Sequence, residues 1–441
     1  MIIPVPAITE GFKDHSYWLD QTPLPAGTMN ELPTRTDVVI VGAGLSGIMT
    51  ALHLARAGCG VTVIEAARPA EFASSRNFGA IGRTIRLGFS TLIKQYGLED
   101  AIRIYTEARE WADTTADFIH QEKIDCGFAR AGRVVAAHSQ PAYDASAREL
   151  ELMQRHIDVA TIMLPRHEQH QELNSDVYYG CAVYSDVGHL DPMKYYAAVY
   201  RLAVAAGVSV IDQTPVIDIN QVGGEYKITT TKGHIHAEQV VVATNAETPR
   251  EGGIFPYLHR RTLPVSLYSG VSIPLSPDLM AELFPASRTM LETRRLYTGL
   301  RPIVGENRLL VVGQHLKHFG DLSTAAYALR LDIAARYPAL ANIQFSHVWH
   351  GRFCITFDWL PHLGSYQGIH YLHGLNGAGI PVCGYLGHKL AMRMLGRPGG
   401  DTVFADRHYP RKIGYKGNAW FMPLVGNWYR WLDRREAKMK R

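Results

Sequence analysis

Residues 37–47, DVVIVGAGLSG, decide the fold of this chain. The segment starts with a short, largely apolar run that ends at a glycine, as is typical of a parallel strand buried on both faces. Residues 45–57 then have helical character and close at Gly58, and residues 61–65, VTVIE, form a second apolar run. Strand, tight turn, helix and strand in this order predict a βαβ unit of the Rossmann type.

The glycines of this segment have the spacing G-x-G-x-x-G. Gly42 permits a tight turn, Gly44 lets the backbone approach a pyrophosphate, and Gly47 lets helix and strand pack closely. The pyrophosphate would lie at the helix N-terminus, where unpaired N–H groups favour an anion. Glu65 ends the second strand, where a carboxylate accepts hydrogen bonds from ribose hydroxyls and disfavours a 2′-phosphate. The segment therefore predicts a site for an adenine dinucleotide.

Composition and charge narrow the class of protein. The 441 residues are 46% hydrophobic and 20% charged, which is ordinary for a globular chain. The net charge of +4 is too small to indicate nucleic-acid binding. The five cysteines form no C-x-x-C pair, so neither a disulfide framework nor a zinc site is predicted. Neither His167-Glu-Gln-His170 nor His234-x-His236 has a metal-site pattern, and we expect no metal.

The sequence shows neither a secretory signal nor a membrane-spanning run. The N-terminal residues lack a basic region followed by an apolar one, and no run reaches the roughly 18 apolar residues of a membrane span. We therefore expect a cytoplasmic protein without a transmembrane segment.

Nucleotide-type elements return at residues 239–246 and 369–395, with strand-rich sequence between about 250 and 357. This order predicts an α/β fold in which a Rossmann-type domain is interleaved with an antiparallel-sheet substrate domain. The expected parts are an extended leader (1–36), the dinucleotide domain (37–100, 150–250 and 350–398), the substrate domain (101–149 and 251–349) and a C-terminal tail (399–441).

Several further segments, taken in order, carry a family resemblance. They are HSYW (15–18), SSRNFG (74–79), VVVATNA (240–246), and the C-terminal set Trp349-x-Gly351, Thr356-x-Asp358, Pro361-His-x-Gly364 and Gly377-Ala-Gly379. Together with the glycine motif they resemble FAD-dependent oxidoreductases of the D-amino-acid-oxidase superfamily, which includes glycine and sarcosine oxidases. The γ-glutamylputrescine oxidoreductase branch is the most similar, and the resemblance spans residues 15–395.

The resemblance implies that the dinucleotide is FAD and that the Rossmann-type domain is an FAD-binding domain. The cofactor-binding residues that it implies are Gly42, Gly44, Leu45, Ser46, Gly47, Glu65, Ala66, Arg76, Asn77, Gly79, Val216, Thr244, Asn245, Trp349, Gly351, Asp358, Gly377, Gly379 and Ile380.

Four residues resemble the catalytic pocket of sarcosine oxidases. Arg83-Thr-Ile-Arg86 is similar to an R-x-x-R segment that crosses the flavin and contributes to binding of the substrate carboxylate. Fixed guanidinium groups can stabilise a reduced flavin or hold an acidic substrate. His315, after the apolar run LLVVG, looks like an active-site histidine, and Tyr297 resembles a pocket tyrosine. A structural role is the alternative for each of the four residues.

The chain also departs from that family pattern. Val311 stands where sarcosine oxidases carry an oxygen-activating lysine, and Pro381 stands where they carry a second carboxylate-binding lysine. Gly351 replaces the cysteine that tethers flavin in some members, and Cys354 is out of register. The departures predict non-covalent FAD, slow reaction with oxygen and a substrate other than sarcosine.

The resemblance thus implies an enzyme that oxidises a C–N bond of a primary or secondary amine or amino acid to an imine. Hydrolysis of the imine would give an aldehyde or keto acid, and the electrons would pass to oxygen or to another acceptor. An acidic small-molecule substrate is one option that the arginines leave open. The alternatives are an amine dehydrogenase subunit with an electron-acceptor partner protein, and a flavin-binding protein without turnover.

Overall fold

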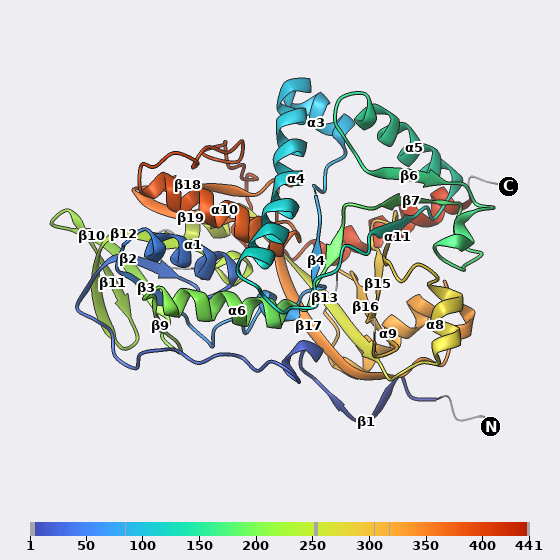
Figure 1. Ribbon diagram of the computed structural model, residues 1–441, viewed down its shortest axis with the longest axis horizontal. Helices are drawn as coiled ribbons and strands as arrows, with labels where there is room; N and C mark the ends of the chain where they lie inside the picture. Colours follow the sequence, from blue (N-terminus) through green and yellow to red (C-terminus); the bar gives the residue numbers. More distant parts are fainter. Residues whose placement is uncertain (1–4, 84, 251–254, 304, 317, 439–441) are drawn as a thin grey trace.

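The computed structural model describes residues 5–83, 85–250, 255–303, 305–316 and 318–438, and these residues build two large sheets flanked by helices (Figure 1). The nucleotide-type sheet has the order β10 (Val216–Val222), β11 (Glu225–Thr230), β12 (Gly233–Val242), β2 (Arg35–Val41), β3 (Val61–Ile64) and β9 (Ser209–Ile211). The hairpin of β18 (His362–Tyr366) and β19 (Ile369–His373) joins it, with β19 parallel to β12.

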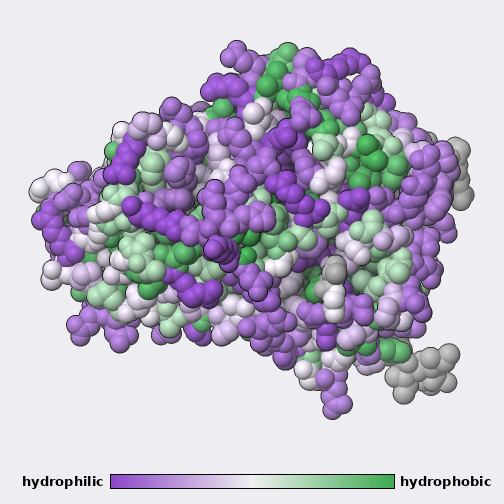
Figure 2. Space-filling model, viewed as in Figure 1, coloured by the Kyte–Doolittle hydropathy of each residue, from purple (hydrophilic) through white to green (hydrophobic). Residues whose placement is uncertain are grey.

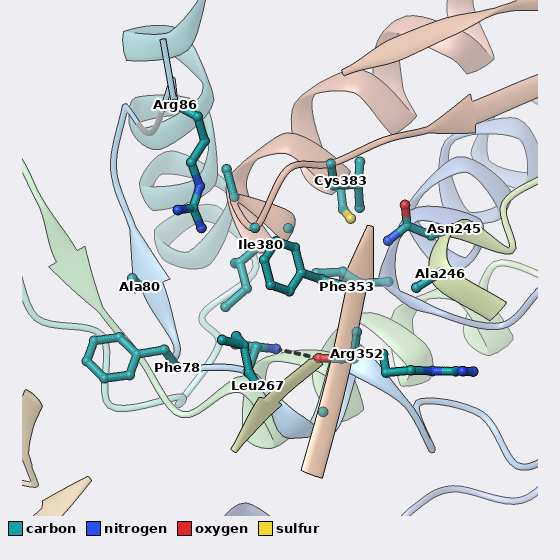
Figure 3. A pocket seen from close by; sticks show the side chains of 18 of the residues that line it. Phe78, Ala80, Arg86, Asn245, Ala246, Leu267, Arg352, Phe353, Ile380 and Cys383 are labelled. Carbon is teal, nitrogen blue, oxygen red and sulfur yellow. Dashed lines mark hydrogen bonds between the residues drawn. The ribbon is translucent and has the colours of Figure 1, made fainter. Parts of the chain in front are cut away.

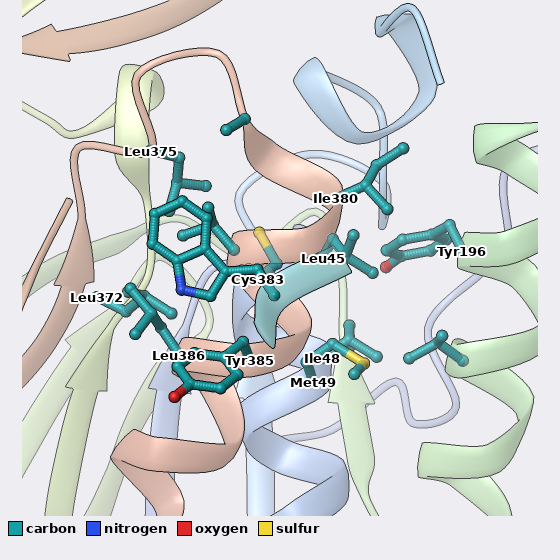
Figure 4. Close-up of a cluster of buried hydrophobic side chains, with 14 of the residues drawn as sticks. Leu45, Ile48, Met49, Tyr196, Leu372, Leu375, Ile380, Cys383, Tyr385 and Leu386 are labelled. Atoms are coloured by element: carbon teal, nitrogen blue, oxygen red, sulfur yellow. The ribbon is translucent and has the colours of Figure 1, made fainter. Parts of the chain in front are cut away.

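Helices cover the nucleotide-type sheet because their apolar faces pack on its buried strands. Helix α1 (Leu45–Arg56) packs against α6 (Pro192–Ala205) and α10 (Gly379–Met394), and α4 (Leu98–Gln121) packs against α10. Figure 4 shows Ile48 of α1 and Leu386 of α10 in this core, and both are fully buried. Parallel strands under such a helical layer need apolar residues on both faces, which explains the runs VVIV and VTVI.

The second sheet has nine strands. Their order is β1 (Ile8–Lys13), β17 (Phe345–Thr356), β13 (Thr262–Ser272), β16 (Arg308–Gly313), β15 (Thr298–Ile303), β14 (Thr289–Glu292), β5 (Arg133–Ala136), β7 (Cys181–Tyr184) and β6 (Thr161–Leu164). The pairs β1–β17 and β14–β5 are parallel, and the other pairs are antiparallel. The predicted α/β fold with an FAD-type sheet and a second sheet is therefore confirmed, and the second sheet is mixed rather than purely antiparallel.

Alternation along these strands sends side chains to two different environments. Val134, Leu300 and Val311 belong to an apolar cluster that α8 (Pro277–Leu283) and α9 (Leu322–Ala334) cover. Their neighbours Val135 and Val312 face the opposite way and line a cavity. One face of the sheet is thus core, and the other is a wall of the candidate site.

The strand pairing differs from the predicted domain boundaries at three places. β6 and β7 lie within residues 150–250 but pair with β5 in the nine-stranded sheet, because their antiparallel hairpin extends that sheet. β17 crosses the boundary predicted at residue 350, since it continues its pairing with β13 as far as Thr356. The leader is not merely extended over the surface, because β1 is an edge strand paired with β17.

The C-terminal tail ends in α11 (Met422–Lys438), whose Met422, Val425 and Tyr429 pack on an apolar cluster at the ends of β13 and β17. The other α-helices and strands of the described residues are α2 (Ala73–Arg76), β4 (Ala80–Ile81), α3 (Phe89–Tyr96), α5 (Gln140–Gln154), β8 (Gly188–His189) and α7 (Phe255–His259). The face drawn in Figure 2 is largely hydrophilic, with apolar residues in scattered groups. None of the helices in the described ranges has the length and apolar character needed to cross a membrane.

Candidate active site

A cavity of about 1050 Å³ lies between the two sheets and is lined by residues of both. Cavities that hold small molecules and cofactors are typically about 300–1,000 Å³, so this one is large for a single small ligand. Its lining includes the glycine-rich turn after β2, the start of α10 and the inner face of the nine-stranded sheet. The arrangement offers room for a dinucleotide together with a small substrate.

The glycine-rich turn has the geometry that its sequence predicts. Gly42 has φ of 107°, a backbone conformation that suits glycine, and Gly44 is the N-cap of α1 without a side-chain cap. A Cβ on Gly47 would lie 2.0 Å from the carbonyl oxygen of Gly42, so only glycine fits there. Gly42 and Gly44 line the cavity, whereas Gly47 serves the packing of helix on strand.

Glu65 lines the same end of the cavity, next to Ala66. Its carboxylate accepts hydrogen bonds from the backbone N–H groups of Ala43 (2.8 Å) and Ala67 (2.9 Å). Burial raises the pKa of this carboxyl group, and the two backbone hydrogen bonds oppose the rise. The side chain is thereby fixed at the tip of β3, with lone pairs left to accept from a ribose hydroxyl.

The segment from Arg76 to Gly79 forms another part of the lining and is held from several sides. The indole N–H of Trp349 donates to the Arg76 carbonyl (3.1 Å), and that of Trp18 donates to the Asn77 carbonyl (3.0 Å). Gly79 has φ of 76°, and a Cβ there would come within 2.2 Å of the Leu190 carbonyl oxygen. The leader motif HSYW therefore braces a cavity segment that lies far from it in sequence.

A second helix begins at the cavity. Gly379 and Ile380 open α10 and line the cavity, and the helix has no side-chain cap. A Cβ built on Gly379 meets nothing within 4 Å, so the backbone there faces open space. Cys383, one turn further, also lines the cavity, and burial raises the pKa of its thiol to about 12, which makes it a poor nucleophile.

Arg86 reaches into the cavity near the ring of Phe353 (Figure 3). Its Nε donates to the Asn376 carbonyl (3.1 Å), its guanidinium lies 5.4 Å from the Tyr297 ring centroid, and one terminal nitrogen is 3.4 Å from the Tyr297 hydroxyl. Within the described ranges no carboxylate pairs with it. The structure thus brings together Arg86 and Tyr297, two of the four predicted pocket residues.

Arg83 also lines the cavity, but its charge is already compensated. Its Nε donates to the Asp186 carboxylate (3.1 Å), and another nitrogen donates to the Asp158 carbonyl (3.0 Å). An ion-paired guanidinium is a weaker candidate for tuning a flavin than a free one. The pairing favours the structural alternative for this residue.

His315 does not belong to the cavity lining of the described residues, which is a correction to its predicted place in the pocket. Its Nε2 lies 3.4 Å from the Asp332 carboxylate of α9, and its ring packs edge-on against Phe319. The residues of this stretch that line the cavity are Val312 and Gln314. Alternation in β16 places Val311 and Val312 on opposite faces, whereas His315 follows the end of the strand at Gly313.

Val311 is fully buried in the apolar cluster behind the sheet. The expected slow reaction with oxygen therefore cannot be argued from Val311. The residues of this stretch that do line the cavity, Val312 and Gln314, are also uncharged, so neither supplies the cation that the lysine of sarcosine oxidases provides.

Most of the predicted cofactor-binding residues line the cavity, and three do not. Besides Gly47, these are Trp349, which supports Arg76, and Asp358, whose carboxylate lies 3.1 Å from the Nε2 of His362. Those that line it are Gly42, Gly44, Leu45, Ser46, Glu65, Ala66, Arg76, Asn77, Gly79, Val216, Thr244, Asn245, Gly351, Gly377, Gly379 and Ile380.

Sequence reasoning missed the cavity residues that the nine-stranded sheet contributes. They include Arg133, Tyr184, Leu267, Ser269, Leu291, Val312, Gln314 and Phe353. The period-2 alternation of each strand was a usable signal for which residues share a face. The order in which the strands pair was not readable, so their common cavity was not predicted.

In the part of the chain that the structure describes, two groups of side chains have the spacing of metal ligands, and neither lines the cavity. They are His15, Asp20 and His347, and His138, Asp433 and Glu436. The ammonium group of Lys13 binds the Asp20 carboxylate (2.6 Å), and the guanidinium of Arg295 binds that of Asp433 (2.6 Å). Both groups are therefore accounted for as ion-pair networks.

Comparison with known proteins agrees with this geometry. The model of the FAD dependent oxidoreductase family, DAO, matches residues 37–393, and the chain belongs to this family. Among its relatives, γ-glutamylputrescine oxidoreductase of Escherichia coli is 26% identical over 93% of this chain and 95% of the relative. The probable oxidoreductase OrdL of Haemophilus influenzae is 26% identical over 90% of this chain and 92% of the relative.

Solved structures share the fold. Glycine oxidase from Geobacillus kaustophilus superposes with a TM-score of 0.69 at 21% identity, covering 86% of this chain and 99% of that structure. L-proline dehydrogenase from P. horikoshii superposes with a TM-score of 0.67 at 18% identity, covering 85% and 96%. The chain is thus an FAD-dependent oxidoreductase of the family that acts on amines and amino acids.

The cavity fits FAD on three features of this chain. Backbone of Gly44, Gly351 and Gly379 faces the space without side chains, two uncapped helix N-termini offer N–H groups to a pyrophosphate, and Glu65 is fixed as an acceptor. In this cavity the residues from Gly42 to Ser46 and Glu65 would hold the ADP part of FAD, and Arg76–Gly79, Gly351 and Gly377 would lie toward its flavin part.

Proposed function

We propose that this protein uses non-covalently bound FAD to oxidise the C–N bond of a primary or secondary amine or amino acid that carries an acidic group. The observation that supports this best is Arg86, a guanidinium without a carboxylate partner among the described residues, in the cavity that fits FAD. A half-buried guanidinium that lines a cavity without a carboxylate partner can bind an anionic substrate group through charge-assisted hydrogen bonds.

When bound, FAD would supply the redox chemistry by accepting a hydride, which is two electrons and one proton, from the C–H bond of the amine. The N–H proton of the oxidised amine would pass to water. Arg86 binds the acidic group and thereby fixes the orientation of the reacting carbon. The aromatic rings of Tyr297 and Phe353 lie 5.4 Å and 5.8 Å from the Arg86 guanidinium and help to fix its position. The product is an imine, which water hydrolyses to an aldehyde or keto acid. No side chain has to act as an obligatory base if the neutral amine binds.

The electron acceptor is oxygen, giving hydrogen peroxide, or a partner protein, as in an amine dehydrogenase subunit. A nearby cation would stabilise the superoxide-like charge formed with oxygen. Val312 and Gln314, the cavity residues nearest in sequence to the position of the oxygen-activating lysine, are uncharged, and the cation Arg86 is assigned to the substrate, which supports the second option. The third candidate is a flavin-binding protein without turnover. Arg86 disfavours it, because a cation without a carboxylate partner in the cavity is suited to binding a substrate.

Acid precipitation of the purified yellow protein tests the cofactor, and we expect intact FAD in the supernatant. Colour that stays on the precipitate would contradict non-covalent binding, which is supported by Gly351 and by the high pKa of Cys383. Anaerobic titration with a panel of acidic and neutral amines tests the activity. We expect at least one acidic amine to bleach the flavin, and air to restore it more slowly than the amine reduced it. A flavin that no amine reduces would overturn the proposal.

A further inference from the structure

Arg133 is a buried guanidinium in the wall of the cavity. It lies on β5, is 9% exposed, and lines the cavity beside Val135. Its Nε has no hydrogen-bond partner, and no carboxylate within the described ranges forms an ion pair with it. Burial lowers the pKa of this group, and the nearby Tyr184, Tyr297 and Asp186 side chains offset only part of that effect.

The nearby cavity carboxylates are bound by other groups. Asp186 accepts from Arg83 (3.1 Å), and Glu292 accepts from Arg336 (2.6 Å) and pairs with Arg294. Glu149 accepts from the backbone N–H of Ser90 (3.0 Å) at the start of α3. No carboxylate of the described residues is therefore left to form an ion pair with Arg133, and a group that enters the cavity can supply one.

Arg301 is a second buried arginine, and its hydrogen bonds show a purely structural role. Arg301, on β15, is 5% exposed and donates to the carbonyl groups of Phe78 (2.7 Å) and Leu190 (3.0 Å). Those contacts hold two segments together. Arg133 makes no such contact with the described part of the chain, so holding the fold together does not explain its burial.

Arg133 and Arg86 act on the same part of the cavity. Both arginines line the cavity, and Arg86 lies 3.4 Å from the Tyr297 hydroxyl. In addition to the effect of burial, the pKa of Arg133 is raised by the nearby side chains of Tyr184, Tyr297 and Asp186 and lowered by the positive charge of Arg86. Two guanidinium groups that repel each other across a cavity are stabilised together by a ligand with two negative charges.

We propose that the substrate is held at two anionic groups, one carboxylate at Arg86 and a second at Arg133. The substrate class is then an amino acid or secondary amine that carries two carboxylates. This inference rests on the proposed function for the reacting C–N bond, but the two anion sites can be tested without any reaction.

The test is calorimetric titration of the protein, with its bound cofactor, with two unreactive ligands of the same shape, glutarate and its monoamide. Wild type should bind glutarate about 10- to 100-fold more tightly, as expected for one further charge-assisted hydrogen bond. Arg133→Gln should remove this preference and leave the affinity for the monoamide within about threefold. Arg133→Lys, which keeps the charge, should retain part of the preference.

Arg308→Gln is the matched control, because Arg308 lies on the same sheet but outside the cavity lining and donates to the Ser272 carbonyl. It should keep the full preference. Equal affinity of wild type for both ligands, or equal weakening of both by Arg133→Gln and Arg133→Lys, would overturn the two-anion proposal. A flavin that no amine reduces would overturn the proposed function and leave these affinities unaffected.

Discussion

At the scale of single residues, Arg86 and Arg83 form a natural comparison because they stand three positions apart in one cavity and differ in their partners. We expect Arg86→Ala to lower kcat/KM for an acidic amine by about 10- to 100-fold, since a charge-assisted hydrogen bond is lost. An uncharged analogue should lose several-fold less. Steady-state kinetics with both substrates measure the difference, and FAD should stay bound.

Arg83→Ala should act on the fold instead. Removing this guanidinium leaves the Asp186 carboxylate, 21% exposed, without its partner, and breaking such a pair costs up to about 3 kcal/mol. The thermal midpoint should fall while the flavin spectrum is unchanged. If Arg83→Ala shifts the spectrum or Arg86→Ala weakens both substrates equally, the roles assigned to the pair are wrong.

Two neighbouring valines test the two faces of β16. Val311→Lys should strongly lower the thermal midpoint, because the new ammonium would lie in a fully buried apolar cluster. Val312→Lys should fold, because it faces the cavity, and it should speed reoxidation of the flavin by oxygen. Stopped-flow reoxidation and thermal melts measure both effects. An equal loss of stability in the two variants would contradict the assignment of faces.

At the scale of elements, α11 is fastened to the site by ion pairs. Arg295 binds Asp433 (2.6 Å) and Glu436, with His138 alongside, and Tyr429 of the same helix lines the cavity. The Arg295 hydrogen bond lowers the pKa of Glu436 below its ordinary value. A lowered pKa in the folded state gives stability that is present above the unfolded pKa, near 4.3, and is lost as pH falls through the folded value.

We therefore expect Glu436→Gln to lower the thermal midpoint at pH 7 and to have progressively less effect below about pH 4.3. Thermal melts of wild type and variant across this range measure the difference. Arg295→Met should show the same convergence toward wild type at low pH. A difference that is independent of pH would mean that the ion pair does not fasten α11.

The elements also show what the sequence could and could not reveal. The buried runs 37–41 and 61–64 and the helix between them were readable, because propensity, periodicity and the glycine pattern agree there. The sheet to which β6 and β7 belong could not be predicted, because the sequence of an antiparallel strand pair does not show which sheet the pair extends. The position of His315 was also not readable from periodicity, because the residue follows the end of β16 at Gly313.

At the scale of the whole molecule, the cavity is a joint product of the two sheets, so cofactor binding should stabilise both together. FAD at 100 times its dissociation constant would add about 2.7 kcal/mol to the free energy of unfolding. We expect protein stripped of FAD to melt a few degrees lower and to regain its midpoint when FAD is added. Circular dichroism, which reports on both sheets, measures the transition.

Gly379→Val supplies the control for this prediction. Its Cβ would meet nothing within 4 Å of the protein but would occupy space in the cavity. The stripped variant should melt like stripped wild type and gain little from FAD. A full gain from FAD in this variant would place the cofactor elsewhere.

The pairing of β1 with β17 has a consequence for how the chain is made. Ile8 of β1 pairs with Phe345 of β17. During synthesis β1 therefore has no partner strand until more than three hundred further residues have been translated. At about 5–20 residues per second, this interval leaves an apolar-bearing edge unpaired for tens of seconds on the ribosome. Such distant pairings slow folding and expose strands to aggregation. The nucleotide-type sheet shares the delay through β19, so neither wall of the cavity can be completed until most of the polypeptide has left the exit tunnel.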